Sequence, residues 1–410
     1  MSETIVNTVL PKWPAVPICD ATRPDVSAWN AREHPDEQKQ YIEIADVDAS
    51  TKAIARTRTV EGRSAPSRAR NVVRAGDVLV STTRPNLNAV ALVPQALDGQ
   101  VCSTGFAVLR PNDRVTSTWL YWFVRSPGFV REISSMVDGA MYPAVTDNEV
   151  RSVSISLPSV PEQKRIAAKL DEQTATLTSA QAALAAQREA ATALRSAVLR
   201  AALDPAAHPN WNDARLGGLV EFVRGVSFKP SEAASSSFAE STPILRAGNI
   251  GDRLDLDQDL IFVPSSRVSE KQRLRRGDLV ICMSSGSAQV VGKTAPLESD
   301  WAGSVGAFCG IIRPSAQVLG MWLRLIFRSD VFRDWRDSQA RGANIQNLRF
   351  SEMANITIPL PSLMQQRNIS EQVNGSMRHI DAIVTSLDDQ AATLDSLRTS
   401  LLDAAFSGQI

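Results

Sequence analysis

The chain has 410 residues, in which 44 basic side chains balance 44 acidic ones, and 43% of the residues are apolar. This composition is ordinary for a globular protein and argues against binding of nucleic acid through bulk charge alone. No apolar run approaches the ~20 residues of a membrane span, and the N-terminus lacks the pattern of a signal peptide. We expect a cytoplasmic protein with reduced thiols and no zinc site, because the cysteines are few and scattered: Cys19, Cys102, Cys282 and Cys309.

Residues 1–158 are predicted to form a mixed α/β domain. Apolar runs indicate strands at 78–80, 106–109 and 153–157. A helix is expected from Trp119 to Val124 and is expected to continue towards Phe129. Polar loops are expected at 81–88 and 138–143.

Basic residues concentrate just ahead of the strand that Gly76-Asp77 introduces. They are Lys52, Arg56, Arg58, Arg63, Arg68, Arg70 and Arg74, against the single acid Glu61. One such run is usually a solvated face. The chain carries a second run ahead of Asp278, made of Arg267, Lys271, Arg273, Arg275 and Arg276. Two runs at equivalent points favour a surface that contacts phosphate.

Residues 159–205 are predicted to form one long helix. Ser159 and Glu162 have the spacing of a capping box, directly after Leu157-Pro158. Mostly apolar residues then recur at alternating steps of three and four, which is the pattern of a coiled-coil seam. The expected seam residues are Ile166, Leu170, Leu177, Leu184, Gln187 and Leu194.

Residues 206–361 are predicted to form a second mixed α/β domain, and residues 362–410 a second long helix. Strands are expected at 279–282, 311–312 and 356–358. A helix is expected from Met321 to Phe327, continuing towards Phe332, and Ser362 with Gln365 repeats the capping box. The second seam is expected at Ile369, Val373, Ile380, Ile383, Leu387, Gln390 and Leu397. Gln187 and Gln390 would place an amide at equivalent seam positions, where it can fix the register.

The second half of the chain repeats the first at an offset of 203 residues. Trp119-Leu120 recurs as Trp322-Leu323, and Leu157-Pro158-Ser159 recurs as Leu360-Pro361-Ser362. Gly76-Asp77 matches Gly277-Asp278 after a small drift in register. Such a chain presents two similar surfaces related by a pseudo-two-fold axis, which suits duplex DNA. The expected fold is α+β, with two similar mixed α/β domains joined by two long helices that form an antiparallel coiled coil.

The polar loops differ between the two halves, whereas the framework residues are shared. Arg, Asn and Gln bond guanine and adenine edges, and Ser or Thr can bond a base edge or a phosphate. Two copies of one scaffold with different loops would read two different sequences. The candidate DNA-contacting residues are Arg56, Arg58, Arg68, Arg70, Ser81, Thr83, Arg84, Asn86, Asn88, Tyr142, Arg273, Arg275, Arg276, Ser284, Ser285, Ser287, Gln289, Lys293, Arg341, Asn344, Gln346 and Asn347.

Catalytic motifs fail on inspection. The stretch from Gly286 to Thr294 resembles a phosphate-binding loop, but its glycines are one residue too far apart and Pro296 follows where a helix should start. Pro24-Asp25 with Glu37 and Lys39 imitates a metal-dependent nuclease pattern, but the second half has no counterpart. We therefore expect recognition without catalysis, with no metal and no cofactor held by this chain.

The order of domain, helix, domain and helix resembles the DNA-specificity subunit of type I restriction–modification systems. The resemblance rests on the Gly-Asp-Val-Leu and Gly-Asp-Leu-Val strands, on Leu-Pro-Ser-x-Pro-Glu-Gln-Lys-Arg-Ile at 157–166, and on the related stretch at 360–369. Trp211 to Leu216 also matches the way a second target-recognition domain of this family opens. The resemblance covers nearly the whole chain.

This resemblance implies a non-catalytic subunit for phage defence, whose two target-recognition domains each bind one half of a bipartite, asymmetric DNA site. The two helices would fix the separation of the half-sites and dock the partners. These would be two modification (methyltransferase) subunits, which bind S-adenosylmethionine and methylate an extruded adenine, together with restriction subunits. One alternative is the specificity partner of a stand-alone or type II-like methyltransferase. Another, of a different class, is a two-headed scaffold that binds protein.

Overall fold

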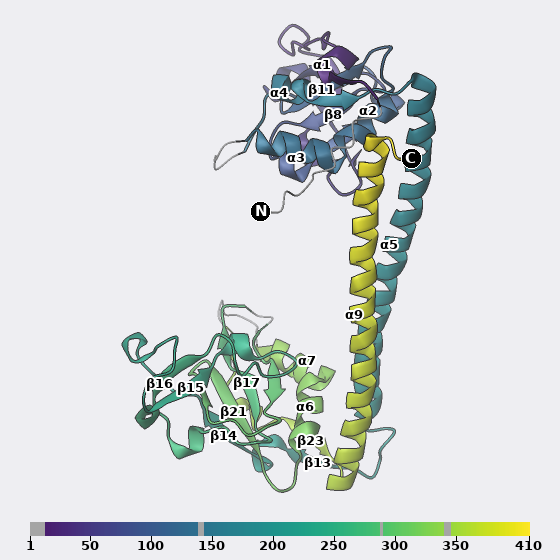
Figure 1. Cartoon of the computed structure of the whole chain (residues 1–410). Helices are drawn as coiled ribbons and strands as arrows, with labels where there is room; N and C mark the ends of the chain where they lie inside the picture. The colour runs from purple at the N-terminus through teal and green to yellow at the C-terminus, as the bar shows by residue number, and fades with distance from the viewer. Residues whose placement is uncertain (1–12, 138–142, 288–289, 340–345) are drawn as a thin grey trace, which may run out of the picture. The chain divides into compact units, whose positions relative to one another are not determined.

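The computed structural model describes residues 13–137, 143–287, 290–339 and 346–410. The chain divides into two compact units (Figure 1). Unit 1 consists of Met1–Ala185 with Asp388–Ile410, and unit 2 of Ala186–Leu387. Both boundaries fall inside a long helix, so each unit holds one globular domain and about half of each helix. The predicted duplication is confirmed, because the two units contain the same core elements in the same order.

The globular part of unit 1 is built on two four-stranded sheets. One is antiparallel with the order β2-β11-β8-β9, and its strands span Thr22–Arg23, Phe106–Pro111, Val78–Ser81 and Val90–Leu92. The other has the order β6-β3-β10-β7, and its strands span Arg58–Glu61, Gln38–Ile42, Val101–Ser103 and Ala69–Val72. Within it β3 and β10 run parallel. Two short pairs complete the domain: β1 (Ala15–Pro17) with β12 (Ser154–Ser156), and β4 (Val47–Asp48) with β5 (Ala53–Ile54).

Short helices flank these sheets: α1 (Ile18–Ala21), α2 (Ser117–Val124), α3 (Pro127–Ser135) and α4 (Asp147–Ser152). The prediction of one helix running towards Phe129 is wrong, because α2 ends and α3 begins at Ser126. The Ser126 hydroxyl accepts the N–H of Phe129, which satisfies a donor that has no partner inside the helix. Pro127 then occupies the first helical position, where its missing N–H costs nothing.

Unit 2 repeats this plan. Its antiparallel sheet has the order β14-β21-β17-β19, with strands spanning Val220–Arg224, Cys309–Pro314, Leu279–Cys282 and Thr294–Pro296. A second sheet has the order β16-β15-β20, with strands spanning Ile261–Pro264, Ser241–Leu245 and Ser304–Val305. Its β15–β20 pair is parallel, as β3–β10 is in unit 1.

The remaining elements of unit 2 also have counterparts. β13 (Asn212–Arg215) pairs with β23 (Thr357–Leu360), as β1 pairs with β12, and β18 (Ser284–Ser285) pairs with β22 (Gln346–Asn347). The helices are α6 (Gly320–Arg328), α7 (Asp330–Gln339) and α8 (Phe350–Met353). The prediction that the first of these continues towards Phe332 is wrong as well, because the backbone of Ser329 is extended and separates α6 from α7.

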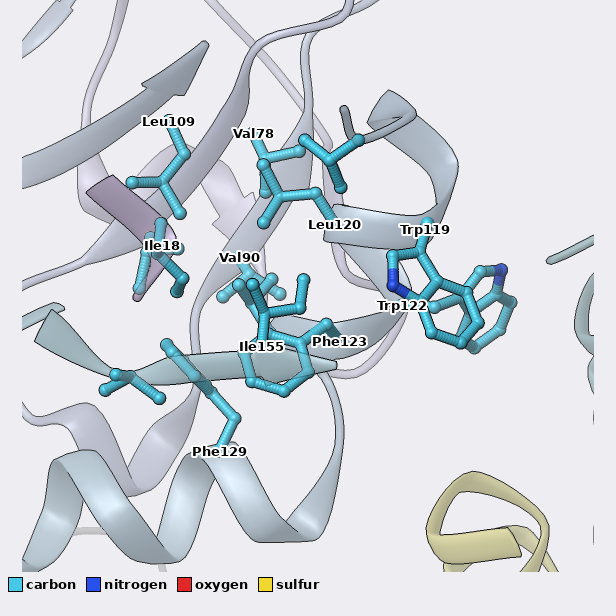
Figure 2. Close-up of a cluster of buried hydrophobic side chains, with 14 of the residues drawn as sticks. Ile18, Val78, Val90, Leu109, Trp119, Leu120, Trp122, Phe123, Phe129 and Ile155 are labelled. Carbon is cyan, nitrogen blue, oxygen red and sulfur yellow. The ribbon is translucent and has the colours of Figure 1, made fainter. Parts of the chain in front are cut away.

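The main core of unit 1 lies where α2 packs on the β2-β11-β8-β9 sheet (Figure 2). Trp119 and Leu120 from α2 are fully buried with Val78 and Leu109 from the sheet. Burial of one such side chain contributes about 1.5–3 kcal/mol. The Trp119 indole N–H donates to the Ser156 carbonyl at 2.9 Å, so its polar atom is also satisfied. In unit 2 the equivalent Trp322 is fully buried and donates to the Pro359 carbonyl at 3.0 Å.

The repeated Gly-Asp pair is explained by a buried ion pair. Gly76 and Gly277 have φ of 86° and 92°, a left-handed conformation that glycine adopts without a steric penalty. The aspartate that follows each glycine is buried and faces an arginine on the central strand. Asp77 forms an ion pair with Arg110 at 2.9 Å, and Asp278 forms one with Arg313 at 2.8 Å. Each aspartate also accepts the N–H of the residue three positions before it.

A buried glutamine fixes the start of each long helix. Gln163 has no exposed surface, and its amide oxygen accepts the N–H of Thr116 at 2.8 Å. Its amide nitrogen donates to the carbonyls of Arg114 and Pro158 at 2.8 and 2.9 Å. Gln366 makes the same three bonds in unit 2, to Leu319, Gln317 and Pro361. The helix is therefore attached to the loop that precedes α2 or α6.

The long helices α5 (Val160–Ala202) and α9 (Leu363–Ser407) contact one another in both units. In unit 1 Gln181 donates to Asp395 at 2.7 Å. In unit 2 Arg195 pairs with Asp381. Advancing along α5 from Gln181 to Arg195 moves the partner back along α9 by the same number of residues, as antiparallel helices require. The predicted antiparallel coiled coil is confirmed.

Several positions of the predicted seam need correction. Ile166, Leu170, Leu177, Val373, Ile380 and Leu387 are buried, whereas Leu184 and Ile369 are half-buried. Leu194, Ile383 and Leu397 are instead 49%, 49% and 53% exposed, and Gln187 and Gln390 are exposed as well. Ala191 and Leu199 are also buried on α5, and polar side chains such as Gln181 and Arg195 make further contacts between the helices. A search for apolar periodicity misses these polar contacts. The capping box of Ser362 with Gln365 is confirmed: the Gln365 amide oxygen accepts the Ser362 N–H at 3.1 Å, and the Ser362 hydroxyl accepts the Gln365 N–H at 3.4 Å.

Candidate nucleic-acid interface

The structure joins the two polar loops of each unit, although they are far apart in the sequence. In unit 1 Thr83 bridges Ala144, and the Arg84 N–H donates to the Pro143 carbonyl at 2.8 Å. In unit 2 the same place is a short ribbon in which Ser284 lies opposite Asn347 and Ser285 opposite Gln346. Backbone pairing therefore brings both loops together in each unit, at equivalent positions of the scaffold.

The side chains of the first loop in unit 1 divide into two groups. Arg84 and Asn86 are exposed, and neither makes a side-chain hydrogen bond or ion pair within the described residues. Ser81 is buried and its hydroxyl donates to the Thr83 carbonyl, while Asn88 is also buried. Arg84 and Asn88 have left-handed backbones, with φ of 49° and 48°, on either side of the turn Pro85–Leu87. This strained turn presents the donors of Arg84 and Asn86 to solvent.

The corresponding surface of unit 2 is different. Ser287, Lys293 and Asn347 are exposed, whereas Ser284 and Ser285 are half-buried. The two serines line a cavity of about 890 Å³ together with Phe228 and Phe308. Phe308 is 69% exposed. It stands in a two-residue insertion relative to unit 1, which sequence reasoning overlooked because the insertion contains no polar side chain. Tyr142, Gln289, Arg341 and Asn344 lie outside the described residues.

The basic run of unit 1 is only partly neutralised. Arg56 pairs with Asp46 at 2.8 Å, Arg58 with Glu43 at 3.2 Å, and Arg63 with Asp36. Arg68 and Arg70 are exposed, and in the described part of the chain no carboxylate pairs with them. Arg74 is also exposed and pairs with none of the described acids, so these three arginines are the most available of the run for contact with phosphate.

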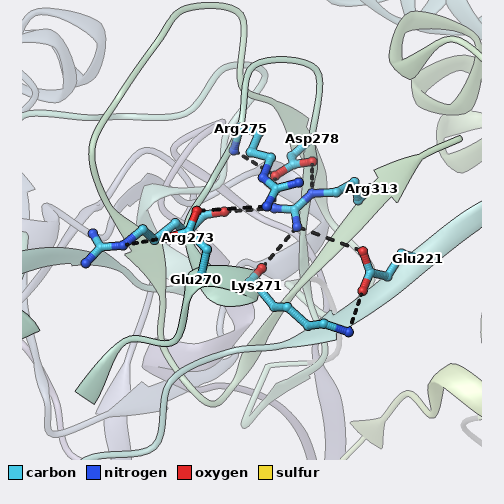
Figure 3. A network of polar contacts seen from close by, with 7 residues as sticks. All are labelled: Glu221, Glu270, Lys271, Arg273, Arg275, Asp278 and Arg313. Carbon is cyan, nitrogen blue, oxygen red and sulfur yellow. Dashed lines mark hydrogen bonds and ion pairs between the residues drawn. The ribbon is translucent and has the colours of Figure 1, made fainter. Parts of the chain in front are cut away.

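The basic run of unit 2 is largely paired (Figure 3). Arg273 and Arg275 both reach Glu270, at 3.5 and 4.0 Å, and Lys271 reaches Glu221 at 3.5 Å. Arg313 holds this segment in place by donating to the Lys271 and Arg273 carbonyls. Exposed ion pairs are worth about 0–1 kcal/mol, so a phosphate could replace either acid at little cost. Arg276 is exposed and pairs with none of the described acids.

Glu37 and Lys39 of the nuclease-like motif have a structural role. Glu37 pairs with Lys39 at 2.8 Å and accepts the Trp29 indole N–H at 2.7 Å. These two bonds, that of Lys39 being the stronger, hold the pKa of Glu37 below its ordinary value. In the described residues no three His, Cys, Asp or Glu side chains gather as a metal site would require. None of the described helices is long and apolar enough to cross a membrane.

Residues 38–186 match the family model of the type I restriction modification DNA specificity domain. This segment runs from β3 to the middle of α5. The StySPI specificity subunit, of a type I restriction enzyme from Salmonella potsdam, is 34% identical over 200 residues, which are 49% of this chain and 43% of that protein. A chain solved in work on complex assembly and conformational transition of the type I restriction–modification system has a TM-score of 0.86. It is 28% identical, over 98% of this chain and 99% of that one.

The chain is therefore similar to the specificity subunits of type I restriction enzymes. The HsdS subunit from Thermoanaerobacter tengcongensis is also similar, with a TM-score of 0.65 and 28% identity over 98% of both chains. The alignment with the StySPI subunit spans less than half the length of that relative. In this chain the shared framework (the Gly-Asp pair, the buried tryptophan and the buried glutamine) occurs once in each unit, whereas the paired loops differ.

Proposed function

We propose that this chain gives a type I restriction–modification complex its DNA specificity, with each unit reading one half of a bipartite site. The observation that carries this proposal is the joining of two polar loops at the same place on two copies of one scaffold. Exposed Arg84 and Asn86 can make bidentate bonds to guanine and adenine edges, whereas unit 2 offers Ser287 and Asn347. Different side chains on one scaffold would read different half-sites.

The chain acts in this proposal without catalysis of its own. Two modification subunits would bind S-adenosylmethionine and methylate adenine, and restriction subunits would complete the complex. Arg68 and Arg70 in unit 1 and Arg276 in unit 2 would contact phosphates and contribute affinity without sequence preference. Such a complex would act on DNA in the cytoplasm, where the free cysteines Cys19, Cys102, Cys282 and Cys309 would stay reduced.

Mapping methylated adenines tests this proposal. The chain is produced with its modification subunits in a host that lacks other methyltransferases, and the methylated sites are determined. Arg84→Ala or Asn86→Ala should relax the preference at one base pair of one half-site, with a loss of about 1–3 kcal/mol. Asn347→Ala should act only on the other half-site.

Arg70→Gln serves as the control, because loss of a phosphate contact should weaken all sequences alike. Loop variants from both units that alter the same half-site, or that weaken all sequences as Arg70→Gln does, would refute the assignment of one half-site to each unit. Methylation of DNA by the purified chain alone would refute the non-catalytic role.

A further inference from the structure

Three cations of unit 1 form a cluster that sequence reasoning did not single out. Lys52 lies in the turn between β4 and β5, Arg125 at the end of α2, and Arg398 on α9. All three are only partly exposed. We call them the cationic cluster. Tyr121 joins Lys52 to Arg125 by contacting both, and the charge of Arg398 acts on both of these cations.

The cluster is held in place by contacts that leave its charges unpaired. The guanidinium of Arg125 stacks on the Trp122 ring at 3.9 Å and on the Tyr121 ring at 4.8 Å. The Lys52 ammonium donates to the Asn88 carbonyl at 2.6 Å, and the Tyr121 hydroxyl donates to the Lys52 carbonyl at 2.8 Å. Lys52 itself has a left-handed backbone with φ of 58°, which a non-glycine residue adopts at a cost.

No carboxylate among the described residues lies within ion-pair distance of the cluster. The two acids that influence it are already engaged. Asp171 accepts the Trp122 indole N–H at 2.9 Å, and Asp48 accepts the backbone and hydroxyl of Ser50 at 2.7 and 2.6 Å. Three cations against these two acids leave a surplus of one positive charge. Most of the N–H donors of the cluster also lack an acceptor in the described residues.

The electrostatics agree with this geometry. Burial, together with the positive charges of Arg125 and Arg398, lowers the pKa of Lys52 to about 8. Burial also lowers the pKa of Arg125, with a smaller contribution from Arg398. Lys52 is therefore destabilised by both arginines, and Arg125 by Arg398. A bound anion would remove that penalty.

Unit 2 neutralises the same positions with its own acids. Arg328, the counterpart of Arg125, pairs with Asp252 at 2.9 Å. Arg195, the counterpart of Arg398, pairs with Asp381. The register that joins Gln181 to Asp395 places Thr178 opposite Arg398, where unit 2 has the aspartate. The hydroxyl of Thr178 donates within its own helix, to the Thr174 carbonyl. Unit 1 therefore keeps the cations and lacks the acids.

We propose that the cationic cluster binds one phosphate of the DNA backbone beside the loop 81–88. This inference rests on the proposed DNA-binding function. Lys52 bonds Asn88, the residue that closes this loop, so a phosphate at the cluster would adjoin the base pairs that Arg84 and Asn86 contact. One phosphodiester carries one negative charge, which matches the surplus, and its oxygens accept charge-assisted hydrogen bonds from guanidinium and ammonium groups.

The salt dependence of DNA binding tests the proposal. The full chain, assembled with its modification subunits, is titrated with a duplex that holds the mapped site and with a random-sequence duplex, at salt concentrations of about 50–200 mM. Thr178→Asp supplies the acid that unit 2 has, and should neutralise Arg398. We expect the slope of log K against log salt to become shallower by about 0.9, and affinity at ~0.1 M salt to fall about eightfold for both duplexes. Arg398→Gln should have the same effect.

Matched variants separate this effect from a general loss of structure. Thr178→Asn has a similar shape to Thr178→Asp without the charge, and should keep the wild-type slope. Arg195→Gln removes the equivalent arginine of unit 2, which is already paired, and should also keep it. Thr178→Asp should melt no lower than the wild type, because it completes an ion pair between the helices.

An unchanged slope in both Thr178→Asp and Arg398→Gln, in a wild-type complex that binds DNA, would overturn the inference and leave the proposed function intact. Variants that keep the wild-type slope but no longer bind the modification subunits would also overturn the inference. The anion that the cationic cluster binds would then be an acidic side chain of a modification subunit. A wild-type complex that has no sequence preference would instead refute the proposed function.

Discussion

The buried ion pair of unit 2 gives a sharp test of how this scaffold is stabilised. The Asp278 carboxylate accepts the Arg275 N–H at 2.8 Å and two N–H groups of Arg313 at 3.0 and 2.8 Å. Asp278→Ala removes the two oxygens that accept these three bonds and leaves a guanidinium whose side chain is only 11% exposed. Loss of one partner from a buried pair costs about 3–5 kcal/mol. Glu221, whose nearest approach to Arg313 is 4.0 Å, can move closer and recover part of this loss. We therefore expect about 3 kcal/mol.

The equivalent variant of unit 1 should cost more. Asp77 is the only described acid within ion-pair distance of Arg110, so no second carboxylate can replace it. We expect about 5 kcal/mol for Asp77→Ala, at the upper end of the same range. Urea unfolding followed by tryptophan fluorescence measures both losses, and hydrogen exchange locates each loss in its own unit. Costs below ~1 kcal/mol, or a larger cost for Asp278→Ala than for Asp77→Ala, would show that the pair does not stabilise the scaffold in this way.

Two further variants test other buried groups. Gln163→Leu should lower the unfolding free energy by roughly 2–4 kcal/mol, because it leaves two carbonyls and one N–H without their partners. Gln366→Leu is the matched variant in unit 2. A loss under ~1 kcal/mol in urea unfolding would contradict the reasoning. The lowered pKa of Lys52, about 8 in the folded chain against an ordinary 10.5, means that the folded chain gives up this proton first. The difference in unfolding free energy between the wild type and Lys52→Met should therefore rise between about pH 8 and 10.5. A flat or falling difference in that range would show that burial and the neighbouring arginines do not destabilise the Lys52 cation.

The fold was largely predictable because its signals are periodic or repeated. The strands at 78–80, 106–109 and 279–282 are continuous apolar runs, and both long helices begin within a residue or two of the expected positions. The failures have local causes. The break at Ser126 is a capping interaction that apolar periodicity does not report. The predicted seam fails at Leu194 because the neighbouring Arg195 makes the contact there, in an ion pair with Asp381.

The candidate interface was less predictable. Residues of the right chemistry were identified in both loops, but the backbone pairing that joins the loops depends on tertiary structure. The pairing of the second basic run with Glu221 and Glu270 was not predicted, and neither was the missing acid at Thr178. Comparison of the two halves could have revealed the latter, since Asp381 and Thr178 occupy equivalent positions of the repeat.

The way the framework residues bond explains how one scaffold can carry two different recognition surfaces. The shared side chains bind one another and backbone atoms of the residues around them. Gln163 bonds the backbone of Arg114 and Thr116, whereas Gln366 bonds that of Gln317 and Leu319.

The two arginines follow the same rule. Arg110 bonds the carbonyls of Asp25 and Val72, and Arg313 those of Lys271 and Arg273. A bond to a carbonyl or an N–H is indifferent to the side chain of the residue that provides it. The partner positions are therefore free to change, from Thr116 to Leu319 or from Val72 to Arg273, while the geometry is kept. Only the few shared side chains must therefore be kept, and the loops between them can change in sequence.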